Sequence, residues 1–164
     1  MKTEQELRLK IRRWIITFMV LLILSGITAF PLEWELKLLV EASTNAPVFI
    51  QDWLKKVYEA IRETNSNYPF MSYGTDWLAF AHLVIATAFI GPLRDPVKNI
   101  WVIQFGMISC VMVIPLALIC GPIRQIPFYW QLIDCSFGVF GMIPLYVCYK
   151  QIQELEKLSI NKNS

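Results

Sequence analysis

Two neighbouring apolar stretches decide the fold of this chain: IWVIQFGMISCVMVIPLALICGPI at residues 100–123 and IPFYWQLIDCSFGVFGMIPLYVCY at residues 126–149. Each stretch has about 24 residues, so a helix rising about 1.5 Å per residue would exceed the roughly 30 Å hydrocarbon core of a bilayer. Only Arg124 and Gln125 separate the two stretches. They therefore predict a transmembrane helical hairpin.

Short sequence motifs are repeated in and next to the hairpin, and we call this repetition the sequence echo. GPLR at residues 91–94 precedes the first stretch, GPIR at residues 121–124 precedes the second, and IPL occurs in both. The offset is about one membrane crossing, so the echo resembles a minimal inverted repeat of the kind that builds a central site in several transporters. Alternatively, Gly-Pro, Arg and Trp are common marks of helix ends at a membrane interface. Both interpretations remain open on the sequence.

Two further apolar stretches complete a set of four. They cover about residues 14–32 and about residues 77–93. The basic segment before residue 14 is typical of a cytoplasmic flank or of a secretory signal, but the apolar run is long for a signal and no small-x-small cleavage site follows. We therefore expect an uncleaved first transmembrane helix. Hydrophobic residues make up 55% of the 164 residues and are gathered into these runs, as in membrane proteins.

The charged residues predict the orientation. Most of the 15 Lys and Arg residues lie in three segments: residues 1–13, residues 94–99 and the tail at residues 150–164. A chain that crosses the membrane four times places these three segments on the same side, and an excess of Lys and Arg indicates the cytoplasmic side. The sequence thus predicts an all-α integral membrane protein that is a single membrane domain over residues 1–164, with four transmembrane helices and both termini cytoplasmic. We expect membrane-interface anchors at the tryptophans near the first position of each span: Trp14, Trp77, Trp101 and Trp130.

The extracytoplasmic segment of this topology is residues 33–75. Within it, residues 47–64 predict an amphipathic helix that starts at a proline favoured in first turns. Its apolar stripe consists of Ile50, Trp53, Leu54, Val57, Tyr58 and Ile61. The helix lies in the membrane interface, packs over the mouth of the bundle or docks a partner.

Polar residues inside spans are the candidate functional residues, because each is costly in hydrocarbon unless it is paired. His82 is the only histidine, and Asp134 is the only carboxylate well inside a span. Their similar depth below the outer interface predicts a buried His82–Asp134 hydrogen bond. Arg124 is a further possible partner for the carboxylate, and Gln104 is the main polar candidate on the inner side.

Small residues support this pairing, because close helix contacts in membranes use them. The faces expected to meet are those of Ala79, His82 and Ala86 on the second span and of Asp134, Gly138 and Gly141 on the fourth. The pair is either a structural clasp that fixes helix order or a protonatable site, since histidine titrates near neutral pH.

Other chemistries find little support in the sequence. The four cysteines form no Cys-x-x-Cys pair, and a Cys120–Cys135 disulfide would join different depths. A haem would have to use His82 with a methionine such as Met107, Met112 or Met142. Neither a Ser/His/Asp set nor a metal-ligand cluster nor a phosphate loop is visible. The sequence therefore predicts no catalytic site, no metal, no cofactor and no nucleic-acid partner.

The expected function is that of a non-enzymatic accessory, scaffold or assembly component of a membrane complex. The alternatives are a small oligomeric transporter or channel-like protein that uses His82 and Asp134 and, with less support, a redox or lipid-modifying subunit. The expected partners are the lipid bilayer and either other membrane proteins or further copies of the chain. We expect the bacterial inner membrane; a eukaryotic membrane stays open, although residues 33–75 contain no Asn-x-Ser/Thr acceptor.

Overall fold

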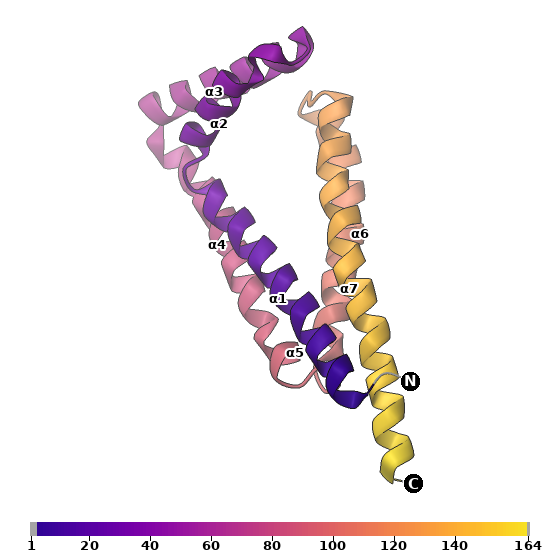
Figure 1. Ribbon diagram of the computed structural model, residues 1–164. Coiled ribbons are helices and arrows are strands. Elements are labelled where there is room, and N and C mark those ends of the chain that lie inside the picture. The colour runs from indigo at the N-terminus through magenta and orange to yellow at the C-terminus, as the bar shows by residue number, and fades with distance from the viewer. Residues whose placement is uncertain (1–2, 164) are drawn as a thin grey trace. The chain divides into compact units, whose positions relative to one another are not determined.

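The computed structural model describes the backbone of residues 3–163 and the side chains of residues 3–159. Within that range the regular structure is helical and contains no strand. The seven α-helices (Figure 1) are α1 (Glu4–Ala29), α2 (Leu32–Ala42), α3 (Val48–Asn67), α4 (Tyr73–Ala88), α5 (Ile90–Arg94), α6 (Ile100–Ile123) and α7 (Phe128–Asn163). Two 3₁₀ turns, η1 (Ser43–Asn45) and η2 (Pro69–Ser72), flank α3.

In the described part of the chain, four helical segments are long and apolar enough to cross a membrane. They are Glu4–Ala29, Pro69–Arg94, Ile100–Ile123 and Phe128–Ser159. This confirms the prediction of an all-helical chain with four candidate membrane spans. The orientation of the termini and the extracytoplasmic location of α3 stay predictions.

The helices run beyond the apolar stretches at both ends of the chain. α1 begins about three turns before residue 14, at a capping box in which the Thr3 N–H donates to Glu6 Oε2 (3.1 Å) and the Glu6 N–H donates to Thr3 Oγ1 (3.3 Å). α7 continues through the tail to Asn163. Hydropathy marks only the apolar part of a helix, so it does not locate these polar ends.

The chain divides into two compact units. One comprises Leu21–Ala86, and the other comprises the chain up to Val20 and from Thr87 onward. α1 passes from one unit into the other. A single membrane domain over the whole chain stays a prediction.

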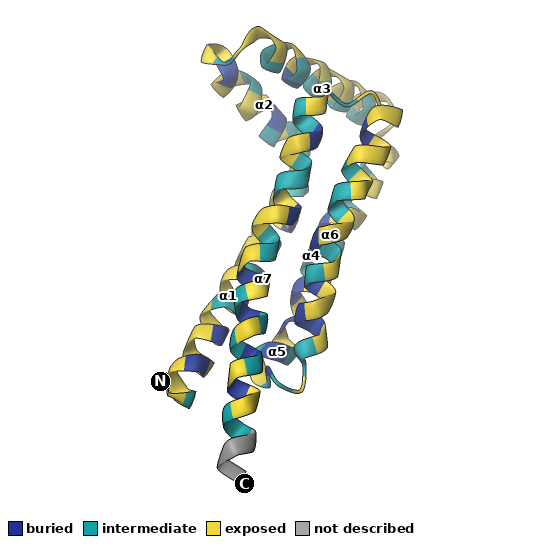
Figure 2. Cartoon of the chain, turned by 90° about the vertical axis from the view of Figure 1, so that its right-hand side faces the viewer, coloured by how far each residue is buried: buried dark blue, intermediate teal, exposed yellow. Residues whose placement is uncertain are grey.

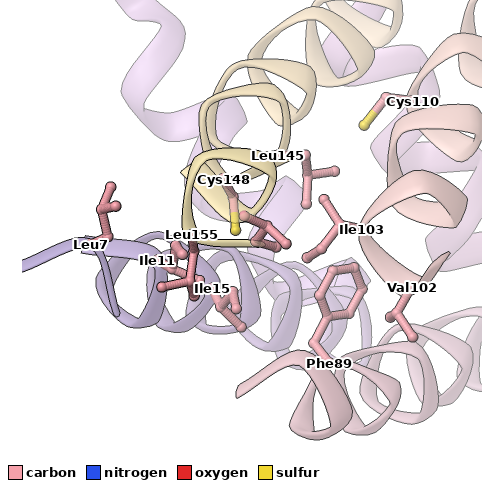
Figure 3. Packing of buried hydrophobic residues seen from close by; sticks show 11 residues of the cluster. Leu7, Ile11, Ile15, Phe89, Val102, Ile103, Cys110, Leu145, Cys148 and Leu155 are labelled. Atoms are coloured by element: carbon pink, nitrogen blue, oxygen red, sulfur yellow. The ribbon is translucent and has the colours of Figure 1, made fainter. Parts of the chain in front are cut away.

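The core of the discontinuous unit joins the start of α1 to α6 and α7 (Figure 3). Leu7, Ile11 and Ile15 are spaced four residues apart, so they form one buried stripe on α1. Phe89 is buried in the same cluster, and its ring centroid lies 4.8 Å from that of Phe18. The other buried members of the cluster are Val102, Ile103, Cys110, Leu145, Cys148, Ile152 and Leu155.

The hairpin of α6 and α7 is packed through glycines. A methyl group on Gly138 of α7 would meet the backbone carbonyl oxygen of Cys110 on α6, and one on Gly141 would lie 3.0 Å from Cys110 Sγ. Backbones can approach this closely only where one residue lacks a side chain. The outward surfaces of both helices carry exposed residues along much of their length (Figure 2), including many large apolar side chains.

The turn between α6 and α7 is a Schellman motif. The Ile126 N–H donates to the Gly121 carbonyl (2.9 Å), and the Gln125 N–H donates to the Pro122 carbonyl (3.1 Å). Gln125 has a φ of 58°, the left-handed conformation in which glycine is usual at this position. A glutamine here therefore holds the turn at a cost in backbone strain.

Candidate functional site

A pocket of the unit Leu21–Ala86 lies among α2, α3, η2, α4 and the connection between α1 and α2. Its volume is about 370 Å³. The walls combine aromatic rings with charged and amide groups, which is the usual composition of a small-ligand site. The residues that give it this character are Phe30, Glu33, Trp34, Lys37, Tyr58, Asn65, Ser72 and Asp76.

Asn65 connects three elements at one side of this pocket. Its Nδ2 donates to Glu33 Oε2 on α2 (2.7 Å), and its Oδ1 accepts a hydrogen bond from Ser72 Oγ of η2. All three side chains are partly buried, so water competes less for these bonds than on an open surface. The Glu33–Asn65–Ser72 clasp therefore fixes α2 and η2 against α3.

The apolar pattern of α3 explains how this layer of helices packs. Leu54 is buried on α3 and Leu36 is buried on the neighbouring α2. The loop before α3 is held by Gln51, whose Nε2 donates to the Ala46 carbonyl (2.8 Å). Tyr58 and Ile61 from the predicted apolar stripe line the pocket.

The pocket combines two carboxylates with one ammonium group. Glu33 and Asp76 are partly buried, whereas Lys37 is exposed and its Nζ lies 4.0 Å from Glu41 Oε1. Trp34 and Tyr58 add flat apolar surfaces. This arrangement suits a polar or cationic group carried on an apolar body, such as a side chain of a partner protein.

Sequence reasoning did not find this pocket, because it assigned no helix to residues 33–46. The segment contains the helix α2, whose buried Leu36 lies on the opposite side from Trp34 and Leu38. An apolar stripe only three turns long gives a weak periodic signal. The acidic residues Glu33 and Glu35 in its first turn were the available indication of a helix start.

The predicted polar residues occupy different surroundings. On α4, the Nδ1–H of the partly buried His82 donates to the Leu78 carbonyl (2.7 Å). On α7, Asp134 is partly buried; Arg124 and Gln104 are exposed. Among the described residues no ion pair joins Arg124 to Asp134. His82 and Asp134 belong to different units, and their hydrogen bond stays a prediction.

The small-residue faces each have a partner within their own unit. A methyl group on Gly26 of α1 would lie 2.8 Å from the Ala79 carbonyl oxygen and 3.0 Å from His82 Cβ, so α1 packs closely on this face of α4. On α7, Gly138 and Gly141 face Cys110 of α6. In the structure, the small-residue face of α4 is in close contact with α1, and the small-residue face of α7 is in close contact with α6.

Gln131 is a buried polar residue that the sequence reasoning missed. It is 4% exposed, and its Nε2 donates to the Ile126 carbonyl (2.8 Å) in the hairpin turn. Its side chain fills the space over Gly121, where an added methyl group would lie 2.5 Å from Gln131 Cδ. This contact closes the end of the hairpin.

The four predicted anchors differ in exposure. Trp77 and Trp101 are exposed near the starts of α4 and α6, whereas Trp14 and Trp130 are half-buried in α1 and α7. Exposed rings of this kind suit a membrane interface, and the anchoring role stays a prediction.

Comparison of the chain with protein-family models, with curated proteins and with solved structures finds no match.

Proposed function

We propose that the chain is a non-enzymatic accessory, scaffold or assembly component of a larger membrane complex. In this proposal it lies in the bacterial inner membrane with both termini in the cytoplasm, as the Lys and Arg distribution favours. The layer formed by α2 and α3 then lies on the outer side. It is the part of the chain that contacts a partner protein.

The observation that carries this proposal is the apolar surface of that layer. Trp34 is 62% exposed and Val48 is 70% exposed, and Leu38 and Leu39 are also exposed. All four lie between the candidate spans that end at Ala29 and begin at Pro69. Large apolar side chains outside a membrane span are typical of a surface that another protein or the membrane interface covers.

The neighbouring pocket strengthens the case for a protein partner. Trp34 contributes both to the apolar surface and to the pocket wall, beside the carboxylate of Glu33. The Glu33–Asn65–Ser72 clasp holds these groups in place before any partner arrives, so little conformational entropy is lost on binding. An exposed aromatic residue next to a partly buried polar pocket is a common anchor of protein interfaces.

The test is affinity purification of the full chain from native membranes in mild detergent, with mass spectrometry of all components. We expect one or more constant partners at near-stoichiometric amounts. Recovery of the chain alone as a discrete oligomer would overturn the accessory role and favour the transporter alternative.

Two variants connect the result to the α2 surface. The double variant Trp34→Gln/Leu38→Gln removes apolar side chains from this surface and should lose most of the partner. Glu41→Gln changes an exposed residue of the same helix without removing apolar surface, so it should retain the partner. Equal recovery from both variants would show that α2 does not dock the partner.

The second candidate function is a small oligomeric transporter or channel-like protein that uses His82 and Asp134. The bond from His82 Nδ1–H to the Leu78 carbonyl favours it, because a neutral ring with its proton on Nδ1 offers only a lone pair at Nε2. Such a ring can bond a carboxyl group at Nε2 only when one of the two has taken up a proton. Pairing with Asp134 would therefore be linked to protonation.

This second function is tested by proton flux into proteoliposomes under an imposed pH gradient. His82→Gln and Asp134→Asn should each abolish the flux, whereas Asp76→Asn, which makes the same charge change near the start of α4, should leave it intact. Absence of flux in the unmodified protein, or flux unchanged in both variants, would exclude the paired site.

A further inference from the structure

We propose that the discontinuous unit contains a binding site for a negatively charged phosphate group, between the first turns of α1 and the segment around α5. The site is a pocket of about 190 Å³. The charged residues of its lining are Arg8, Arg12 and Arg94. The inference is independent of the proposed function, because it uses neither the α2 surface nor the His82–Asp134 pair.

The pocket has a net positive charge. Arg12 and Arg94 have no ion-pair partner among the described residues, whereas Arg8 Nη2 lies 3.0 Å from Glu4 Oε1. The nearest acidic residue in sequence to Arg94 is Asp95, and Asp95 is engaged by Lys98, whose Nζ lies 3.7 Å away and whose N–H donates to Asp95 Oδ1 (3.1 Å). Two guanidinium charges therefore remain available to an anion.

The chemistry of arginine suits a phosphate group. A guanidinium presents parallel N–H donors that match two oxygens of a phosphate, and such bidentate bonds are stronger than neutral hydrogen bonds. Arg8 and Arg12 are one helical turn apart on α1, so they lie on the same side of that helix. Arg94, in the last turn of α5, adds a third arginine to the lining of the same pocket.

The size and depth of the pocket favour the headgroup of an anionic phospholipid over a soluble phosphate. The volume is below the roughly 300 Å³ of ordinary small-molecule sites, so it accommodates a phosphate group and little more. Arg12 and Arg8 precede Trp14, the expected interface residue, by about 3 Å and about 9 Å along the helix, which is the depth of the headgroup layer.

The apolar part of the pocket supports the same source. Leu9, Ile11, Pro92, Leu93 and Pro96 complete its lining. Leu9 is 57% exposed, so it offers apolar surface that a soluble anion would not use. Basic pockets between membrane helices are a known way of holding anionic lipid headgroups.

The experiment compares lipid binding by the full chain and by two matched variants. The protein is placed in nanodiscs of phosphatidylcholine with roughly 20% phosphatidylglycerol, an anionic share chosen so that electrostatic binding is measurable. The lipids that the protein retains after gentle extraction are counted by native mass spectrometry. Arg12→Gln/Arg94→Gln removes the two unpaired charges. Arg13→Gln/Lys98→Gln removes two charges from the same segments but from residues that do not line the pocket.

We expect the unmodified chain to retain phosphatidylglycerol and the pocket variant to retain it about tenfold more weakly. The control variant should retain it as the unmodified chain does. Saturable binding of inorganic phosphate in detergent, lost in the pocket variant alone, would support the site with a soluble anion as its source. Equal losses in the two variants, or binding of neither probe, would overturn the proposal.

Discussion

Gly138 sets the distance between α6 and α7. We predict that Gly138→Ala lowers the free energy of unfolding by about 1–3 kcal/mol, because its methyl group would meet the Cys110 carbonyl oxygen, which belongs to the backbone and cannot rotate away. The loss is measured as a lower thermal midpoint in detergent, followed by tryptophan fluorescence. Gly74→Ala is the control: a methyl group there meets nothing within 4 Å, so stability should stay the same or rise slightly.

A second prediction at this scale concerns Gln125 in the hairpin turn. Gln125→Gly should raise the thermal midpoint by about 2–4 °C, because glycine adopts a positive φ without the strain that a side chain brings. Gln125→Ala removes the same polar group but keeps Cβ, so it should give no such rise. An equal rise in both variants would mean that the glutamine side chain, and not the backbone, limits the stability.

Individual residues were only partly predictable from the sequence. The spacing of Asp134, Gly138 and Gly141 predicted a face of α7 that meets the second span, but every apolar helix offers a surface that could cover such a face. The structure gives this face Cys110 of α6. Gln131 was overlooked because a lone amide beside a tryptophan gives no periodic signal, and its bond to the Ile126 carbonyl forms only once the turn closes.

At the scale of elements, α2 is held to α3 by Asn65. We predict that Asn65→Asp loosens α2 and η2, because it replaces the donor to Glu33 Oε2 with a second carboxylate at the same distance. The amides of α2 should exchange with solvent about tenfold faster in hydrogen-exchange measurements in nanodiscs, which corresponds to about 1.4 kcal/mol. The rest of the chain should keep its exchange rates.

Asn67→Asp is the matched control for this change. Asn67 is the exposed last residue of the same helix. Its replacement with aspartate adds the same negative charge within one turn of Asn65. It should leave the exchange of α2 unaltered. Equal acceleration in the two variants would show that added charge, and not the lost hydrogen bond, loosens the layer.

Elements were predictable where their apolar residues are numerous. The 20 residues of α3 provide several turns of a polar and an apolar face, and the predicted range 47–64 overlaps it closely. The 11 residues of α2 do not, and the polar ends of α1 and α7 have no hydropathy signal at all. The bond between Asn65 and Glu33 joins residues that are 32 positions apart, so no local sequence pattern predicts it.

At the scale of the whole molecule, the proposed orientation can be tested with cysteine labels. The four native cysteines are first replaced with alanine, and Asn45→Cys or Glu156→Cys is then added at an exposed position. A membrane-impermeant maleimide should label Asn45→Cys in intact cells and should label Glu156→Cys only after permeabilisation. The reverse pattern would invert the topology, and labelling of both sites in intact cells would exclude it.

The number of candidate spans was predictable because about 20 consecutive apolar residues are the requirement that a bilayer imposes on a crossing helix. The arrangement of those spans was not predictable, because an apolar side chain finds equally apolar surroundings in lipid and against a neighbouring helix. Orientation depends on the Lys and Arg of the connecting segments.

The short connection between α6 and α7 also constrains how the protein is made. Residues 124–127 join Ile123 to Phe128, and a chain of that length reaches at most roughly 17 Å even when fully extended. Packed helices lie about 8–10 Å apart, so the connection keeps the end of α6 within packing reach of the start of α7 once both have emerged from the ribosome. A ribosome stalled before α7 is complete would leave α6 without the surface of α7 that covers Cys110 and Gly106.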